Sequence, residues 1–260
     1  MGVSDHFGFI QGSPLNNRMI INTHRIKVFI DFDGTITKID TGEEIFRRFG
    51  KQPDADRIIE DIREGIITAK EGWVRLFASA PDMTIKNIYS IMDDIFIDEN
   101  FVEFHQLLKI QNIPHFILSD GFENYIQFIL QREGLQDIPV FSNRLIESGS
   151  NGLMPQFPYM DEECRDCANC KRDHIIEQSG DEEFTVYIGN GSSDTCPAQF
   201  CDYVFAKDDL LKFCSREKVT CFSYNNFADV QNVFIQLLQR KRLKKKHQAV
   251  LKRNEVYKLG

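Results

Sequence analysis

Short apolar runs separated by helical patterns constrain the fold of this 260-residue chain more than any other feature. Each run has four or five residues and is too continuous for a strand with one face in water. The runs are Lys27–Ile30, His115–Leu118, Phe184–Ile188, Tyr203–Ala206 and Val219–Phe222. Helical patterns lie between them, for example at Gly121–Glu133, Lys171–Gln178 and Lys207–Arg216. The alternation predicts an α/β fold, a doubly wound parallel sheet with helices on both faces.

A helical segment interrupts this alternation. Helical periodicity without a strand pattern occurs at Glu43–Phe49, Asp56–Glu64, Ala69–Ala78 and Ile85–Ile95. We therefore predict a helical cap inserted into the sheet domain. The predicted division is a core of residues 22–40 and 110–236, a cap of residues 41–109, an N-terminal extension over residues 1–21 and a basic C-terminal tail over residues 237–260.

Two carboxylates follow the first apolar run, in the segment Asp31-Phe32-Asp33-Gly34-Thr35. Residues two apart in an extended chain point to the same side, so Asp31 and Asp33 can face one cavity, and Gly34 permits a sharp turn. A carboxylate beside a divalent cation can attack phosphorus, and a second one can protonate the leaving oxygen and then activate water. The alternative is a polar turn without chemistry.

This segment resembles the first motif, D-x-D-G-T, of the haloacid dehalogenase superfamily of phosphatases. Three further segments follow in the order that the resemblance implies. Ile117–Gly121 resembles the second motif, Lys171 the lysine of the third, and Gly189–Asp194 the fourth. Taken singly, these segments are also compatible with a turn, a surface lysine and a loop. Their joint occurrence favours the superfamily.

The resemblance implies a site beyond the carboxyl ends of the strands. It implies catalysis by Asp31, Asp33 and Lys171, phosphate binding by Gly34, Ser119, Asp120 and Gly121, and a magnesium site at Asp31, Asp33, Asn190 and Asp194. We also expect Asp40 and Glu43, at the hinge to the cap, to contact the rest of the substrate. The alternative is that these two acids only favour the N-terminus of a helix through its dipole.

The fourth motif departs from the family pattern at Asn190. The family usually reads G-D-G-x-x-D, and the first Asp binds magnesium. An asparagine offers an amide oxygen without charge, whereas hard divalent cations prefer carboxylate. We therefore expect weak or altered metal dependence. Two alternatives follow, a protein that binds phosphorylated ligands without turnover and a phosphotransferase that uses the same covalent intermediate.

Cys164, Cys167 and Cys170 form a C-x-x-C-x-x-C segment. Thiols at this spacing can converge on zinc, but three do not complete a structural site. A fourth ligand would have to come from His174, Cys196 or Cys201. Because seven cysteines is an odd number and no export signal is present, reduced thiols are the expectation and zinc the alternative.

The cysteine segment narrows the resemblance to the phosphoserine-phosphatase-like branch. With Asp194-Thr195-Cys196-Pro197 it is similar to the phosphoethanolamine/phosphocholine phosphatases. Thr68–Gly72 and Phe205–Leu211 are similar to the 2-hydroxy-3-keto-5-methylthiopentenyl-1-phosphate phosphatases of methionine salvage. The resemblance implies a magnesium-dependent phosphatase that acts on a small metabolite through an aspartyl-phosphate. The methylthiopentenyl phosphate is the first candidate, and phosphoethanolamine, phosphocholine and phosphoserine are the alternatives.

Charge and hydropathy argue against other classes. The net charge of −8 disfavours a general nucleic-acid binder, although Arg240–Lys246 is locally basic. No apolar segment has spanning length, and the N-terminus lacks the pattern of an export signal. We expect a cytoplasmic enzyme, monomeric or homodimeric, with no nucleic-acid or membrane partner.

Overall fold

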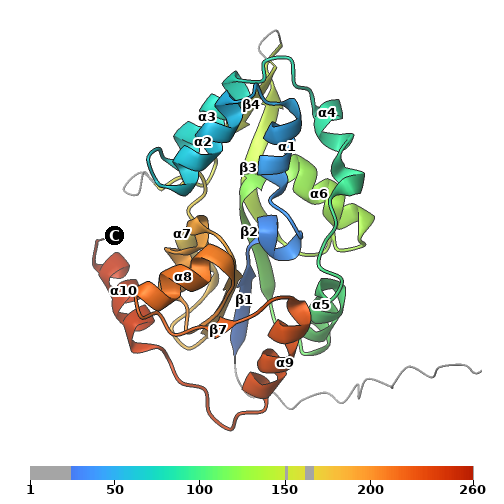
Figure 1. The fold of residues 1–260 in the computed structure, drawn as a ribbon. Helices are drawn as coiled ribbons and strands as arrows, with labels where there is room; N and C mark the ends of the chain where they lie inside the picture. Colours follow the sequence, from blue (N-terminus) through green and yellow to red (C-terminus); the bar gives the residue numbers. More distant parts are fainter. Residues whose placement is uncertain (1–24, 150–151, 162–166, 260) are drawn as a thin grey trace, which may run out of the picture.

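A seven-stranded sheet in the order β4-β3-β2-β1-β5-β6-β7 forms the centre of the protein (Figure 1). The computed structural model describes residues 25–149, 152–161 and 167–259, so the predicted N-terminal extension lies outside the described residues. The strands are β1 Ile26–Ile30, β2 His115–Phe122, β3 Val140–Glu147, β4 Leu153–Gln156, β5 Phe184–Gly189, β6 Tyr203–Ala206 and β7 Phe222–Ser223. Neighbouring strands are parallel except β3 and β4. The predicted α/β class is confirmed.

Different helices cover the two faces of the sheet, because successive strand residues point to opposite faces (Figure 1). Val28 and Ile30 belong to the larger core, whereas Phe29 between them belongs to the second core. The larger core includes α5 (Phe101–Ile110), α6 (Glu123–Arg132) and α9 (Phe227–Leu238), and the second includes α7 (Lys171–Gln178) and α8 (Asp208–Arg216). Burial on both faces explains why the strand sequences are continuously apolar.

Four helices follow the first motif, as predicted for the cap. They are α1 (Thr41–Phe49), α2 (Asp54–Arg63), α3 (Ala69–Ala78) and α4 (Ile85–Tyr89), and the first three lie beyond the end of β1 (Figure 1). The Asp40 and Thr68 side chains cap α1 and α3. The Trp73 and Phe77 rings of α3 contact Phe122 at the end of β2, with ring centroids 5.0 and 5.2 Å apart. These aromatic contacts join the cap to the sheet.

Two helices from the segments predicted to be cap and tail pack on the sheet domain. Helix α5, within the predicted cap range, packs on α9, with the Phe101 and Phe227 ring centroids 4.8 Å apart. Helix α10 (His247–Leu259), within the predicted tail, packs on the short turn Pro197–Phe200. The division into core, cap and tail stays a prediction. In the described ranges, no helix combines the length and apolarity needed to cross a membrane.

Two strands were absent from the sequence prediction, and one was misplaced. β3 and β4 form an antiparallel pair at one edge of the sheet. At the other edge, Val219–Phe222 was expected to be a strand, but only its last residue belongs to β7. Edge strands bury less surface, so their sequences carry a weaker apolar signal than the central strands.

Candidate active site

Most of the predicted site residues line one cavity of about 1090 Å³ at the carboxyl ends of the parallel strands. They are Asp31, Asp33, Gly34, Asp40, Glu43, Asp120, Gly121 and Asn190. The remaining three, Ser119, Lys171 and Asp194, are buried and reach the lining residues through hydrogen bonds. The structure therefore brings together residues from β1, β2, β5 and α7 that are up to 163 positions apart, from Asp31 to Asp194.

Lys171, the first residue of α7, lies between two carboxylates. Its Nζ atom is 2.7 Å from Oδ1 of Asp31 and 2.7 Å from Oδ1 of Asp194, and it also donates to Ser193 Oγ at 3.0 Å. Burial disfavours the charge on Lys171, but the Asp194 and Asp31 carboxylates raise its pKa above the usual value. Burial and Asp194 raise the pKa of Asp31, and Lys171 opposes this shift. The lysine is thus a fixed cation beside the predicted nucleophile.

Asp194 accepts four hydrogen bonds. Tyr187 OH and Lys171 Nζ donate to its Oδ1, at 2.6 and 2.7 Å, and the backbone N–H groups of Asn190 and Gly191 donate to its Oδ2, at 2.8 and 2.9 Å. A carboxylate has about four lone-pair positions, so a cation that bound Asp194 directly would have to displace one of these donors. Asp194 here holds the loop after β5 against Lys171. Its predicted part in the metal site stays a prediction.

Asp33 is held from three elements. Its Oδ2 accepts from Tyr125 OH at 2.8 Å and from Ser119 Oγ at 3.1 Å, and its Oδ1 accepts from the backbone N–H of Thr41 at 3.3 Å. Burial raises the pKa of Asp33, and the hydrogen bond from Tyr125 opposes the shift. Tyr125 was missed in the sequence analysis. Its only signal is its spacing, four residues after Gly121 in the sequence.

The second motif is organised around the Ser119 side chain. Ser119 Oγ donates to Asp33 and accepts from the Gly121 backbone N–H at 2.9 Å. The Asp120 carboxyl group faces the cavity, and burial raises its pKa to about 6. Asn169, also missed, donates from Nδ2 to the Ser119 carbonyl oxygen at 2.8 Å. Phosphate binding by Ser119, Asp120 and Gly121 stays a prediction that this geometry accommodates.

Asp40 and Glu43 line the cavity, but both are also engaged in the cap. Asp40 accepts the backbone N–H of Glu43 at 2.8 Å as the N-cap of α1. The residue is exposed, yet the protein around its carboxyl group and the neighbouring Asp33 raise its pKa to about 7. Glu43 forms ion pairs with Arg63 at 2.6 Å and with Arg47 at 3.2 Å. The helix-terminal alternative is therefore realised for Asp40, and contact of either acid with substrate stays a prediction.

Three residues with oxygen donors suited to magnesium line the cavity where β1 and β5 end. The donors are the Asp31 carboxylate, the Asp33 backbone carbonyl and the side-chain oxygen of Asn190, which accepts from Thr35 Oγ1 at 3.0 Å. Gly34 has a φ of +72°, and a Cβ atom there would lie 2.4 Å from Nδ2 of Asn190. Only glycine permits this close approach. The donor set fits a hard divalent cation, with one carboxylate fewer than the family pattern.

The cysteine segment is described only in part, because Cys164 lies outside the described residues. Cys170 is buried at the start of α7, and burial raises the pKa of its thiol to about 12. Its sulfur lies near the Asp161 and Asp173 carboxylates, in a group that could hold a metal ion. Arg172, however, already pairs with both of these carboxylates. Reduced thiols stay the prediction, and zinc binding stays the untested alternative.

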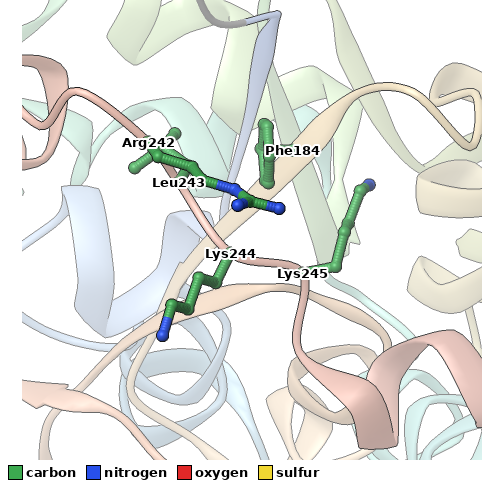
Figure 2. Close-up of a pocket in the computed structure, with 5 residues that line it drawn as sticks. All are labelled: Phe184, Arg242, Leu243, Lys244 and Lys245. Atoms are coloured by element: carbon green, nitrogen blue, oxygen red, sulfur yellow. The ribbon is translucent and has the colours of Figure 1, made fainter.

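A second cavity, of about 600 Å³, lies near the start of β5, away from the catalytic carboxylates (Figure 2). Phe184 of β5 and Arg242, Leu243, Lys244 and Lys245 of the segment before α10 line it. Lys245 pairs there with Asp202 at 3.4 Å. This cavity contains none of the predicted site residues.

The sheet order, the inserted helices and the Asp31–Lys171–Asp194 cluster define a phosphatase of the haloacid dehalogenase superfamily. The chain matches the family model described as "Putative Phosphatase" over residues 26–244, and it belongs to that family. The predicted superfamily is confirmed, and the chain is a phosphoric monoester hydrolase.

Curated relatives and solved structures agree with this class. A 2-hydroxy-3-keto-5-methylthiopentenyl-1-phosphate phosphatase of Bacillus cereus is 29% identical over 222 residues, covering 83% of this chain and 99% of that protein. The corresponding Brevibacillus brevis protein is 28% identical over 217 residues, covering 83% and 97%. A phosphoserine phosphatase structure with a phospho-aspartyl intermediate analogue has a TM-score of 0.63 at 21% identity, covering 81% and 98%. A Salmonella enterica HAD family hydrolase has a TM-score of 0.65 at 17% identity, covering 86% and 74%. The two structures show a shared fold.

Proposed function

We propose that this phosphatase hydrolyses a small phosphorylated metabolite through an aspartyl-phosphate on Asp31. The arrangement of Asp31 carries the proposal. Lys171 fixes its Oδ1 at 2.7 Å, whereas its Oδ2 accepts no hydrogen bond from any residue that the structure describes. Asp31 also lines the cavity. One carboxylate oxygen is thus anchored and the other is available to attack phosphorus.

Two proton transfers by Asp33 complete the proposed cycle. Asp31 Oδ2 forms a bond to phosphorus while the bond to the leaving oxygen breaks, and Asp33 gives that oxygen its proton. Asp33 then takes a proton from the water that attacks the aspartyl-phosphate, which releases phosphate and restores Asp31. Lys171 stabilises negative charge near Asp31 in both steps. Magnesium, bound by the oxygen donors of Asp31, Asp33 and Asn190, would add positive charge beside the phosphoryl oxygens.

The apolar side chains on the cavity wall support the inference that the substrate has an apolar end. Ile62, Ile66, Ile67, Trp73 and Leu76 line its cap side. The curated relatives are named for a phosphate ester that carries a methylthio group. We therefore infer that 2-hydroxy-3-keto-5-methylthiopentenyl-1-phosphate is the first candidate substrate.

The alternatives are phosphoethanolamine, phosphocholine and phosphoserine, each of which carries an amino or ammonium group. Such a group is best held by a carboxylate. Glu43 is already paired with Arg63 and Arg47, whereas Asp40 and Glu64 line the cavity without an ion pair among the described residues. The names of the curated relatives therefore decide the order of the candidates.

Phosphate release from these four compounds with magnesium present tests the proposal, with the Asp31→Asn variant as the blank. We expect release from the methylthiopentenyl phosphate or a stable analogue to be fastest, and Asp31→Asn to lose at least about 10³-fold in kcat while keeping its circular dichroism spectrum. Substantial activity in the Asp31→Asn variant would refute the assignment of Asp31 as the nucleophile. Faster release from a cationic substrate would refute the substrate assignment alone.

A further inference from the structure

Tyr125 contacts the acid–base carboxylate of the proposed mechanism without lining the cavity. It lies on α6, and its side chain is fully buried. Its hydroxyl donates to Oδ2 of Asp33 at 2.8 Å. The hydroxyl therefore contacts Asp33 although Tyr125 is not among the residues that line the cavity.

The local backbone is shaped to permit this contact. A Cβ atom on Gly121 would lie 1.8 Å from the Tyr125 hydroxyl oxygen and 2.5 Å from Oδ2 of Asp33. Any side chain at position 121 would therefore separate the two groups. The ring of Tyr125 is fixed between Phe32, beside the catalytic strand, and Phe122, with ring centroids 6.4 and 6.5 Å away. A rigid aromatic ring thus delivers the hydroxyl to one defined position.

The hydrogen bonds distinguish the two oxygens of Asp33. Oδ2 accepts from both Tyr125 and Ser119, which fills its two lone pairs. Oδ1 accepts the longer bond from the Thr41 backbone, at 3.3 Å, and the Thr41 side chain also stabilises the charged carboxylate. Without the Tyr125 hydroxyl, Oδ2 would lose the shorter of its two hydrogen bonds, and the Asp33 carboxyl group would be held less firmly in one orientation.

We propose that Tyr125 is a positioning residue for acid–base catalysis, because its hydroxyl fixes the orientation of the Asp33 carboxyl group that exchanges protons with the leaving oxygen and with water. The inference rests on the proposed function, since it assigns Asp33 the proton transfers. It adds a residue that none of the four motifs contains. Tyr125 does not line the cavity, so its removal should slow the acid–base steps and leave substrate binding nearly unchanged.

The dependence on the leaving group separates this role from a structural one. A leaving group of low pKa, such as p-nitrophenol, departs without a proton, whereas an alkyl alcohol needs one. We expect Tyr125→Phe to lower kcat/KM, which reports the steps up to departure of the leaving group, by about tenfold or more for an alkyl phosphate and by less than about threefold for p-nitrophenyl phosphate. A distorted site would slow both substrates alike.

Tyr89→Phe is the matched control. Tyr89, on α4, stacks on Phe128 of α6, the helix that carries Tyr125, with ring centroids 5.1 Å apart. Its hydroxyl makes no hydrogen bond to the part of the chain that the structure describes. This variant loses a hydroxyl beside α6 without touching Asp33, so both kcat/KM values should equal those of the wild type.

A double-mutant cycle gives a second, independent test. If Tyr125 acts only through Asp33, Tyr125→Phe has no further effect on alkyl phosphate hydrolysis in an Asp33→Asn background. Equal losses for both substrates, no loss, or additive losses in the cycle would each overturn the inference. An inactive wild type would instead contradict the proposed function, so the two failures are distinguishable.

Discussion

At the scale of single residues, the loop after β5 shows how one substitution changes a site without changing its shape. Asn190 places its side-chain oxygen where the family pattern has a carboxylate, and Thr35 Oγ1 donates to that oxygen at 3.0 Å. Its backbone N–H donates to Asp194, as an aspartate's would. The geometry is kept and one negative charge is missing. Metal affinity is therefore the property expected to differ.

Replacing Asn190 with Asp should restore that charge. We expect the Asn190→Asp variant to bind magnesium about tenfold more tightly, because a carboxylate attracts the cation more strongly than an amide does. Calorimetric titration of both proteins with magnesium measures the change directly. Asn254→Asp, an exposed substitution on α10, adds the same charge elsewhere and should leave the affinity unchanged. Equal affinities in all three proteins would contradict the expectation.

At the scale of elements, helix α7 links catalysis to the packing between strands. Lys171 and His174 are three residues apart and thus lie on one face of α7. Lys171 reaches Asp31, and His174 Nε2 bonds with Asn169 Oδ1 at 2.8 Å. Asn169 Nδ2 in turn donates to the carbonyl oxygens of Ser119 and Phe141, which fixes its orientation and makes His174 the donor. The start of α7 is thereby tied to β2 and β3.

His174 should make stability depend on pH. Burial lowers its pKa from 6.5 to about 4, so between these values the unfolded chain binds a proton that the folded protein does not. The folded state therefore loses stability as the pH falls below about 6.5, and the effect amounts to about 2 kcal/mol between pH 7.5 and pH 5. Urea unfolding at both values measures it. His174→Gln lacks the titrating group, so its loss of stability over the same range should be about 2 kcal/mol smaller; equal losses would refute the assignment.

The central elements and most motif residues follow from the sequence, because buried parallel strands are continuously apolar and the motifs stand at their ends. β3 was missed because Ser142, Asn143 and Arg144 interrupt its apolar character, and β4 because it is a short edge strand that contains Pro155. Tyr125 and Asn169 could not be predicted, since their hydrogen bonds depend on how α6 and α7 dock against the sheet. The local sequence does not specify how either helix packs against the sheet.

At the scale of the whole molecule, the C-terminal segment closes one side of the sheet domain (Figure 1). Arg253 on α10 is buried and donates from Nε to the Phe200 carbonyl oxygen at 2.9 Å. Its Nη2 donates to Ser179 Oγ at 3.0 Å and to Thr185 Oγ1 at 3.4 Å. One guanidinium group thus joins α10 to the end of α7, to β5 and to the turn after it. The basic segment Arg240–Lys246 thus leads into a helix that is part of the folded sheet domain.

Removing this guanidinium should weaken the fold without altering the active site. We expect Arg253→Met to lower the free energy of unfolding by about 2–4 kcal/mol, because three buried oxygens lose a charged donor. Urea denaturation measures the loss, and KM should be unchanged. Lys241→Met, at an exposed position of the preceding segment, removes the same charge and should have an effect within about 0.5 kcal/mol. Equal stabilities of the two variants would show that α10 does not contribute to folding.

The aromatic contact between the cap and the end of β2 has a mechanical consequence. Phe122 touches Trp73 and Phe77 of α3, and it directly follows Gly121, whose missing side chain admits Tyr125 to Asp33. The position of α3 and the position of the residue next to Gly121 are therefore set by the same aromatic contacts. The packing of the cap and the geometry around Asp33 are in this way mechanically linked.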